Sequence, residues 1–150
     1  MHLKIPPVVV AFLASLFMYI LAEFLPVGYF DFTGRVYMMY VLLGFGGLIG
    51  LVSLLQFFIK KTTVNPRKLN NSSVLVVNGV YKFTRNPMYL ALLLFLLAWG
   101  LFLGNAFNVL LAAFFVSYMN AFQIKPEEEV LVKLFGVAYS NYMVKVRRWF

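Results

Sequence analysis

Four long apolar runs, separated by polar segments, dominate the pattern of this chain. They extend from Pro6 to Leu25, from Val36 to Ile59, from Met88 to Leu103 and from Ala106 to Phe122. A helix rises about 1.5 Å per residue and the hydrocarbon core of a bilayer is roughly 30 Å thick, so the first two runs are long enough to cross it. Only Gly104 and Asn105 separate the two shorter runs, which predicts a tight helical hairpin. Gly46 and Gly50 form a small-xxx-small pair in the second run, which predicts a face for close helix packing.

The composition agrees with a membrane protein and narrows the possible chemistry. Of the 150 residues, 63% are apolar and 12% are charged, and the mean hydropathy is +0.86. A soluble fold of this length has no interior large enough for so many apolar side chains. The chain has no cysteine and one histidine, His2, so thiol chemistry is excluded and a metal site is not expected. We therefore predict an all-α membrane protein that forms a single domain over residues 1–150.

The basic residues are distributed unevenly between the connecting segments. Of the 13 Lys and Arg residues, only Arg35 lies between the first and second runs. The other twelve lie before the first run, between the second and third runs, or after the fourth. Lys and Arg accumulate on the cytoplasmic side of membrane proteins. We therefore expect about four transmembrane helices, with both termini and the long polar loop in the cytoplasm. This topology and contact with anionic membrane lipids explain the net charge of +8 without a nucleic-acid partner.

An acidic segment, Lys125-Pro126-Glu127-Glu128-Glu129, follows the fourth run. Proline in a first helical turn, followed by carboxylates, is typical of a helix start. Apolar residues then recur at helical spacing from Leu131 to Val146, which predicts a C-terminal amphipathic cytoplasmic helix, packed on the membrane surface or against the bundle. Two interpretations of the carboxylates stay open: a solvated helix cap, or groups that bind the hydroxyl or ammonium groups of a cofactor.

Arg85, just before the third run, also has two interpretations. It can anchor the helix at the membrane surface, or it can present a guanidinium group to a carboxylate or phosphate. Tyr81 and Tyr89 lie on either side of it in the sequence, and tyrosine is common where a helix meets the membrane surface. The single residues therefore do not decide between a structural and a functional role.

The combination of these residues resembles the superfamily of isoprenylcysteine carboxyl methyltransferases and phospholipid methyltransferases. Its signature reads Arg-His-Pro-x-Tyr-x-Gly, then one helical hairpin, then Glu-Glu. Here Arg85-Asn86-Pro87-Met88-Tyr89-Leu90-Ala91 and Glu127-Glu128 stand at those positions, and the resemblance covers residues 60–148. Asn86 replaces the usual histidine and Ala91 the usual glycine. Because asparagine does not titrate near neutrality, a mechanism that needs a protonatable ring at position 86 does not apply here.

The resemblance implies S-adenosylmethionine as the cofactor, bound at the cytoplasmic ends of the last two membrane helices and covered by the C-terminal segment. It also implies catalytic roles for Arg85 and Tyr89. The implied cofactor contacts come from Leu75, Val76, Tyr81, Asn86, Pro87, Tyr89, Glu127 and Glu128. The methyl group of this cofactor is already activated by its sulfonium, so the protein mainly has to position two reactants and exclude water. The expected acceptor is lipid-like, with either a carboxylate, as on a prenylated cysteine, or an amine, as on a phospholipid.

Two other classes of function stay open on the sequence. One is a membrane reductase of related architecture that uses a nicotinamide cofactor, although such a cofactor favours additional basic residues for its phosphates. The other is a non-catalytic helical membrane module, in which the acidic and basic segments serve only folding and topology. Binding of S-adenosylmethionine to the purified protein would separate these possibilities.

Overall fold

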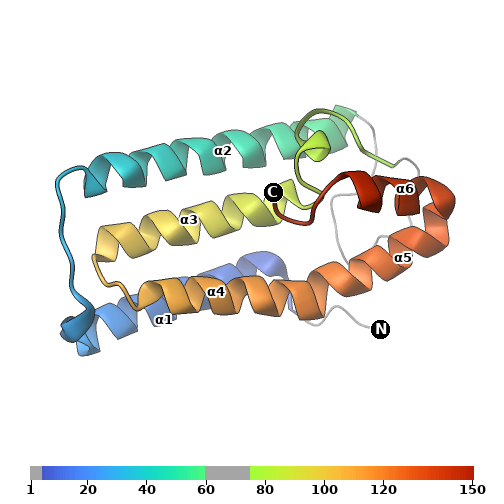
Figure 1. Ribbon diagram of the computed structural model, residues 1–150. Helices are drawn as coiled ribbons and strands as arrows, with labels where there is room; N and C mark the ends of the chain where they lie inside the picture. The colour runs from blue at the N-terminus through green and yellow to red at the C-terminus, as the bar shows by residue number, and fades with distance from the viewer. Residues whose placement is uncertain (1–4, 60–74) are drawn as a thin grey trace.

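The computed structural model describes residues 5–59 and 75–150, and within them the chain forms a bundle of four long helices with two shorter helices beyond one end (Figure 1). The bundle helices are α1 (Pro7–Phe24), α2 (Arg35–Ile59), α3 (Pro87–Leu103) and α4 (Asn108–Met119). The π-helical turn η4 (Asn120–Ile124) leads from α4 into α5 (Lys125–Phe135), which is followed by α6 (Val137–Lys145). Two short 3₁₀ turns, η1 (Pro26–Gly28) and η3 (Gly79–Lys82), lie in the connections. Lys4 and the polar loop of residues 60–74 lie outside the described residues.

Each of the four apolar runs forms a helix, as predicted. Three helical stretches are long and apolar enough to cross a membrane: Pro7–Phe24, Arg35–Gln56 and Asn108–Phe135. The fourth, α3, is shorter at 17 residues and packs against α1, α2 and α4. Large apolar side chains are exposed along the outer faces of α1 and α2, as expected where a helix contacts lipid. The chain is therefore an all-α integral membrane protein.

The connection between α3 and α4 is the predicted tight hairpin. Gly104 ends α3 with a φ of 64°, in the left-handed region that glycine adopts without strain. A side chain at this position would also meet the Arg35 guanidinium, since a Cβ would lie 2.3 Å from Nη1. Asn105 then donates a hydrogen bond from Nδ2 to the Leu25 carbonyl (2.8 Å), which ties the hairpin to the end of α1.

Arg35, the one basic residue expected on the opposite side of the membrane, has a structural role. Its Nη1 donates to the carbonyls of Leu101 (3.0 Å) and Phe102 (3.3 Å) at the last turn of α3. Its Nε forms an ion pair with Asp31 Oδ1 at 3.0 Å. The last carbonyls of a helix lack partners within the helix and carry partial negative charge, so a cation there stabilises the end of α3.

Helix α2 approaches α3 closely at Gly46 and Gly50, which confirms the predicted packing face. A Cβ at Gly46 would lie 2.9 Å from Phe95 Cε1, and a Cβ at Gly50 would lie 3.3 Å from Ala91 Cβ. The second contact also shows how Ala91 is accommodated where the superfamily usually has glycine. Its methyl group faces a position on α2 that carries no side chain.

We expect Gly50→Leu to destabilise the fold by about 1–3 kcal/mol, because the added side chain has to enter the contact between α2 and α3. Gly47→Leu is the matched control, since nothing lies within 4 Å of a Cβ built at Gly47. Thermal unfolding of the purified variants in detergent measures both effects. Equal losses for the two substitutions would contradict close packing at Gly50.

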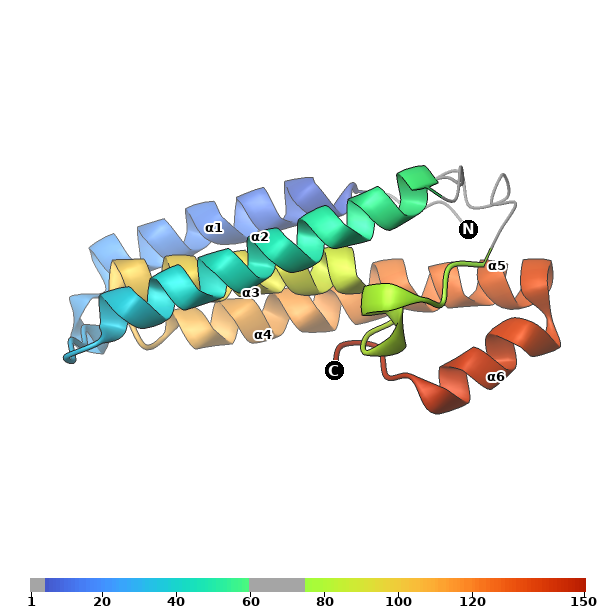
Figure 2. The same cartoon turned by 90° about the horizontal axis from the view of Figure 1, so that it is seen from above.

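The C-terminal segment is helical as predicted, with two differences in detail. First, α5 begins at Lys125 as predicted, but no break precedes it, because the chain continues from α4 through η4 into α5. Pro126 lacks an N–H group and cannot complete an α-helical bond, and the π turn, in which the Lys125 N–H bonds to the Asn120 carbonyl, lies immediately before it. Second, the helix ends at Phe135, and Gly136, with a φ of 53°, reverses the chain so that α6 runs back alongside α5 (Figure 2).

Candidate functional site

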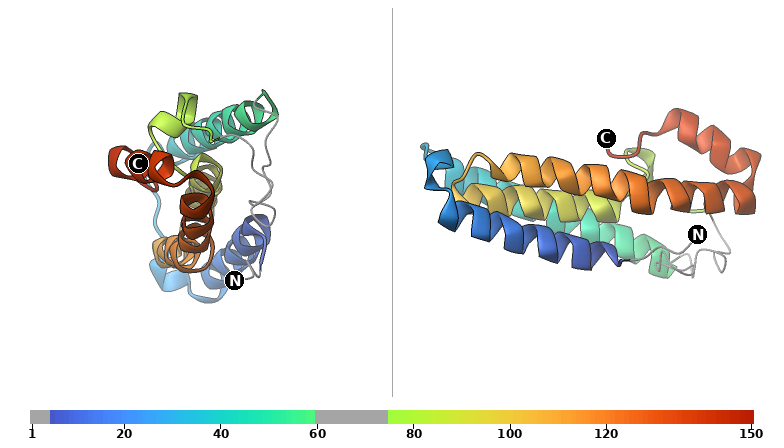
Figure 3. Two further views of the ribbon diagram at one scale, coloured as in Figure 1. Left: turned by 90° about the vertical axis from the view of Figure 1, so that its right-hand side faces the viewer. Right: turned by 90° about the horizontal axis from the view of Figure 1, so that it is seen from below.

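The two motifs of the predicted site lie at the same end of the bundle. The hairpin between α3 and α4 returns the chain to the level at which α3 begins, and α5 extends beyond that end (Figure 3). The C-terminus folds back to the start of α3, so three segments distant in sequence meet there (Figures 1 and 2). The structure therefore brings the Arg85 segment into contact with the Glu127-Glu128 pair.

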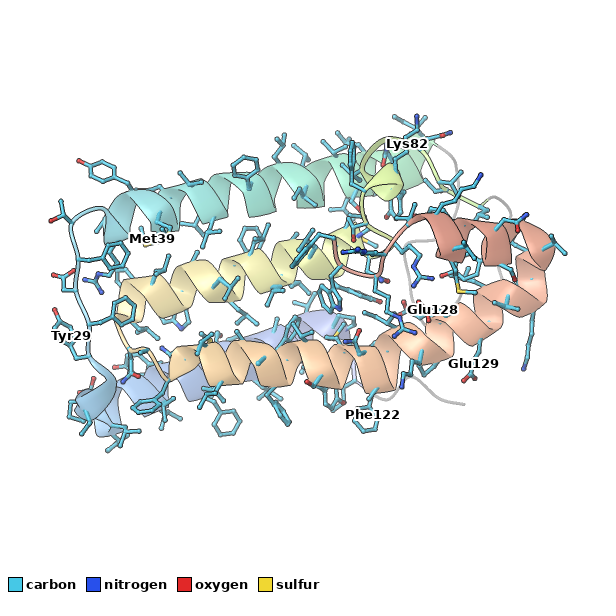
Figure 4. The ribbon with its side chains drawn as sticks, viewed as in Figure 1. Tyr29, Met39, Lys82, Phe122, Glu128 and Glu129 are labelled. Carbon is cyan, nitrogen blue, oxygen red and sulfur yellow. The ribbon has the colours of Figure 1, made fainter. Side chains whose placement is uncertain are left out.

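Glu128 is the centre of a buried group of charges. Its Oε1 lies 3.0 Å from Arg85 Nη2, and the two side chains are 12% and 9% exposed. Arg148 binds the same carboxylate with two hydrogen bonds, from Nε to Oε1 (3.0 Å) and from Nη2 to Oε2 (2.7 Å). These bonds raise the pKa of Arg148 above its usual range, so the guanidinium stays charged. Glu129, one residue further along α5, is exposed and points away from this group (Figure 4).

Arg85 retains hydrogen-bond donors that no described residue uses. Its Nε and Nη1 are buried and have no partner within residues 5–59 and 75–150. A buried N–H group without an acceptor is costly, so these positions favour the binding of a further oxygen atom. The guanidinium can therefore hold Glu128 and still bind a carboxylate or another polar group of a ligand.

Tyr89 and Glu127 form a second buried contact between α3 and α5. The Tyr89 hydroxyl donates a short hydrogen bond to Glu127 Oε1, and both residues are buried. Pro87 occupies the first turn of α3, where its missing N–H costs nothing, and thereby fixes the start of the helix that carries Tyr89. A hydroxyl and a carboxyl group from different helices are thus held together beside the charges around Glu128.

Asn86 binds the C-terminal segment and does not cap α3. Its Nδ2 donates to the Arg148 carbonyl (2.9 Å), which also accepts a bond from Thr84 Oγ1 (3.0 Å). The Arg85 N–H bonds to the Arg147 carbonyl at 3.0 Å. The side-chain amide that replaces the usual histidine therefore helps to hold the last residues of the chain across the start of α3.

Three of the implied cofactor contacts lie in a packed apolar layer and not on an open surface: Leu75, Val76 and Tyr81. Val76 and Tyr81 are buried against Tyr139 and Tyr142 of α6, and Leu75 is partly buried beside them. The Tyr81 hydroxyl lies 2.8 Å from Ser53 Oγ, and the Tyr142 hydroxyl donates to the Tyr81 carbonyl at 2.6 Å. Burial raises the pKa of Tyr139 to about 12, and it raises the pKa of Tyr81 and Tyr142 as well, so these hydroxyls stay protonated at neutral pH.

A hollow of about 520 Å³ lies between α5 and α6, beside this layer. That volume is within the range of small-molecule sites. Its lining combines charges of both signs with two apolar side chains: Lys125, Glu128, Glu129, Val132, Lys133 and Met143. Since Val132 and Met143 also pack against the layer around Tyr81, the hollow connects that layer with the charges around Glu128.

The sequence did not reveal the contribution of the last residues of the chain. The sequence indicates only a cytoplasmic cation at Arg148, whereas in the structure its guanidinium donates two hydrogen bonds to Glu128. Trp149 donates from Nε1 to Asn120 Oδ1 (3.0 Å) in the π turn. An asparagine within an apolar run and a tryptophan N–H that needs an acceptor were available as signals, but their pairing depends on the tertiary fold.

Comparison with known proteins supports one family. The model of the phospholipid methyltransferase family matches residues 35–138. A protein-S-isoprenylcysteine O-methyltransferase of Schizosaccharomyces pombe is 33% identical over 79 residues, which are 53% of this chain and 34% of that protein. An uncharacterized protein of Haemophilus influenzae is 52% identical over 62 residues, 41% of this chain and 98% of that protein. The chain thus spans about a third of the Schizosaccharomyces pombe protein, and no solved structure matches it significantly. Since the family model covers more than half of the chain and includes both motifs of the site, this chain belongs to the phospholipid methyltransferase family.

Proposed function

We propose that this protein transfers a methyl group from S-adenosylmethionine to a lipid-like acceptor at the cytoplasmic membrane surface. The contact of the Arg85-to-Tyr89 segment with Glu127 and Glu128 carries the proposal, because it forms one polar site beside an apolar bundle. Membership of the phospholipid methyltransferase family supports the reaction class. The distribution of the basic residues supports the cytoplasmic side, since the site lies at the end of the bundle opposite to Arg35.

The residues around the hollow fit the chemical groups of this cofactor. Its amino-acid part carries an ammonium and a carboxylate, and the hollow offers carboxylates as well as the ammonium groups of Lys125 and Lys133. The free donors of Arg85 suit the same carboxylate. We propose that Val132 and Met143 contact the adenine, with the layer of Leu75, Val76 and Tyr81 behind them. Asn86, Pro87, Tyr89, Glu127 and Glu128 complete the proposed binding site.

The protein itself contributes to the reaction by positioning the two reactants and by excluding water. When bound, the cofactor would supply a methyl group on a sulfonium sulfur. The acceptor would bond to the methyl carbon as the carbon–sulfur bond breaks and S-adenosylhomocysteine leaves, so no nucleophilic side chain is needed. Arg85 and Arg148 fix the Glu128 carboxylate from two sides, and Tyr89 fixes Glu127. The C-terminal segment covers the start of α3 through the bonds to the Arg147 and Arg148 carbonyls. Such fixed surroundings hold two reactants in line and lower the entropic part of the barrier.

The acceptor reaches this site from the bilayer. The outer faces of α1 and α2 are apolar and exposed, as suits a protein whose surroundings are lipid chains. Its reacting group is either a carboxylate, which is already anionic at neutral pH, or an amine, which first has to lose a proton. The names of the matched family and of the Schizosaccharomyces pombe relative support these two kinds of acceptor, phospholipid and prenylcysteine.

Cofactor binding to the purified full chain tests the proposal. Labelled S-adenosylmethionine is expected to bind saturably in detergent micelles, and S-adenosylhomocysteine, the product, is expected to displace it. Reduced nicotinamide adenine dinucleotide is the matched competitor and is expected not to displace the labelled S-adenosylmethionine. Binding of the nicotinamide alone would favour a membrane reductase, and binding of neither cofactor would favour a non-catalytic helical module; each result would overturn the proposal.

A second measurement identifies the acceptor. The protein is incubated with methyl-labelled cofactor and either a lipid extract, phosphatidylethanolamine or a farnesylated cysteine. Labelled lipid is recovered in the organic phase and treated with alkali: label that stays non-volatile indicates an N-methylated amine, whereas label released as volatile methanol indicates a methyl ester. Absence of transfer to all three, with intact cofactor binding, would contradict a lipid-like acceptor.

A further inference from the structure

A second cavity lies at the end of the bundle far from the proposed methyl-transfer site. Its volume is about 430 Å³, and its lining is almost entirely apolar. All four bundle helices contribute, with Met18 from α1, Met38 and Leu42 from α2, Leu97 and Gly100 from α3, and Asn108 from α4. The first α3 residue that lines it is Leu97, ten residues after Pro87, so about 15 Å of helix separate this cavity from the start of α3. The cavity is therefore distinct from the cofactor site.

Asn108 is the unusual residue of this cavity. It is only 2% exposed, and neither its Nδ2 nor its Oδ1 has a hydrogen-bond partner in the part of the chain that the structure describes. Asn105, which lines the same cavity, differs, because its Nδ2 donates to the Leu25 carbonyl and its Oδ1 accepts from the Phe107 N–H at 3.0 Å. The N–H of Asn108 itself is bonded to the Asn105 carbonyl at 3.1 Å, so the side chain is not required as a helix cap.

An unpartnered amide buried between helices is costly, because water has no access to it and the apolar side chains around it offer no hydrogen bond. Buried polar residues inside a membrane bundle therefore indicate a function by default. The amide of Asn108 has both a donor and an acceptor free, so it suits a group that donates and accepts at the same time. A hydroxyl does both, whereas an ester or ether oxygen only accepts.

We propose that this cavity binds a membrane lipid that has a single apolar chain and a hydroxyl group, with the hydroxyl bonded to Asn108. The apolar lining accommodates part of the chain, and its volume lies within the range of sites for small ligands. Helices α1 and α2 both line the cavity yet scarcely contact one another, so a lipid chain enters between them from the bilayer. The position of Asn108 at the first residue of α4, next to the α3–α4 hairpin, places the hydroxyl near the membrane surface.

The test compares two probes that differ in one hydrogen-bond donor, hexadecanol and hexadecyl methyl ether. The full chain is placed in nanodiscs of dioleoylphosphatidylcholine, which has no hydroxyl group, and its melting temperature is followed as each probe is added. The alcohol is expected to stabilise the protein at a concentration roughly three- to tenfold lower than the ether. In Asn108→Leu the two probes are expected to act alike, while the affinity for S-adenosylmethionine stays unchanged.

Two further variants make the result decisive. Ser117→Ala removes a hydroxyl from the exposed side of α4, outside the cavity, and is expected to keep the preference for the alcohol. Leu42→Trp fills the cavity from α2 without changing Asn108 and is expected to weaken the stabilisation by both probes. It serves in place of Asn108→Leu if that variant does not fold. Equal action of the two probes on the wild-type protein, or a preference that persists in Asn108→Leu, would overturn the proposal. Geranylgeraniol and monooleoylglycerol then distinguish an isoprenoid alcohol from a glycerolipid as the source of the hydroxyl.

Discussion

Glu128→Gln is expected to destabilise the protein by roughly 3–5 kcal/mol and to abolish the binding of S-adenosylmethionine. The substitution removes the negative charge that Arg85 and Arg148 share, and Arg85 is left as a buried cation without a counterion. Most of the loss comes from Arg85, whose side chain is 9% exposed, because the 36% exposed side chain of Arg148 can turn to solvent. The melting temperature in detergent and equilibrium binding of labelled cofactor measure the two effects.

Glu129→Gln is the matched control for the loss of stability only, because Glu129 also lines the hollow of the proposed cofactor site. It makes the same change of charge at the next residue of α5, where the side chain is exposed and points away from the arginines (Figure 4). We expect its stability to stay within about 0.5 kcal/mol of the wild-type value. Similar losses for Glu128→Gln and Glu129→Gln would show that the acidic segment acts through its overall charge, and the specific role of Glu128 would be wrong.

Tyr89→Phe is expected to weaken cofactor binding by about tenfold or more and to cost about 1–3 kcal/mol of stability. The substitution keeps the ring and removes only the hydroxyl that bonds to Glu127, so a buried carboxyl group loses its partner. Because this contact joins α3 to α5, its loss also loosens the position of the segment that carries Glu128. Binding of labelled S-adenosylmethionine and methyl transfer to lipid give the two readouts.

Tyr37→Phe controls for the loss of a tyrosine hydroxyl in general. Tyr37 lies on α2 near the opposite end of the bundle and is 76% exposed. We expect this variant to bind the cofactor as the wild-type protein does. If Tyr89→Phe binds equally well, the hydroxyl of Tyr89 takes no part in the site and the proposed catalytic role falls.

Basic residues at the two ends of the bundle make specific contacts, in addition to their expected effect on membrane orientation. Arg35 stabilises the last turn of α3, and Arg85 and Arg148 hold a carboxylate at the other end. From the sequence, membrane orientation alone explains Arg35 and Arg148, and Arg85 has two open interpretations. Arg35 thus stabilises the end of a helix, whereas Arg85 and Arg148 neutralise a carboxylate on another helix.

The sequence by itself determined the class of the protein and the approximate limits of its helices. Length and hydropathy of an apolar run are local quantities, and the bilayer selects for them directly, so Pro6 to Leu25 and Val36 to Ile59 could be recognised without knowledge of any neighbour. The hairpin at Gly104 and Asn105 follows from equally local backbone preferences. The motif around Arg85 and the pair of Glu127 and Glu128 were also visible, since they form a pattern of residue types at a fixed order along the chain.

Only the tertiary structure decided which partner each polar group has. Glu128 and Arg148 are 20 residues apart, Asn86 and Arg148 are 62 apart, and Tyr89 and Glu127 are 38 apart, so no local preference relates them. The π turn before Pro126 sets the rotation of α5 and thereby the side from which Glu128 points, and the reversal at Gly136 sets the course of α6. The same holds for Asn108, whose amide has no partner among residues 5–59 and 75–150 because of how four helices meet around it. Hydrogen bonds form between groups that packing brings within reach, and in this protein the packing of apolar helices determines the environment of the few polar side chains.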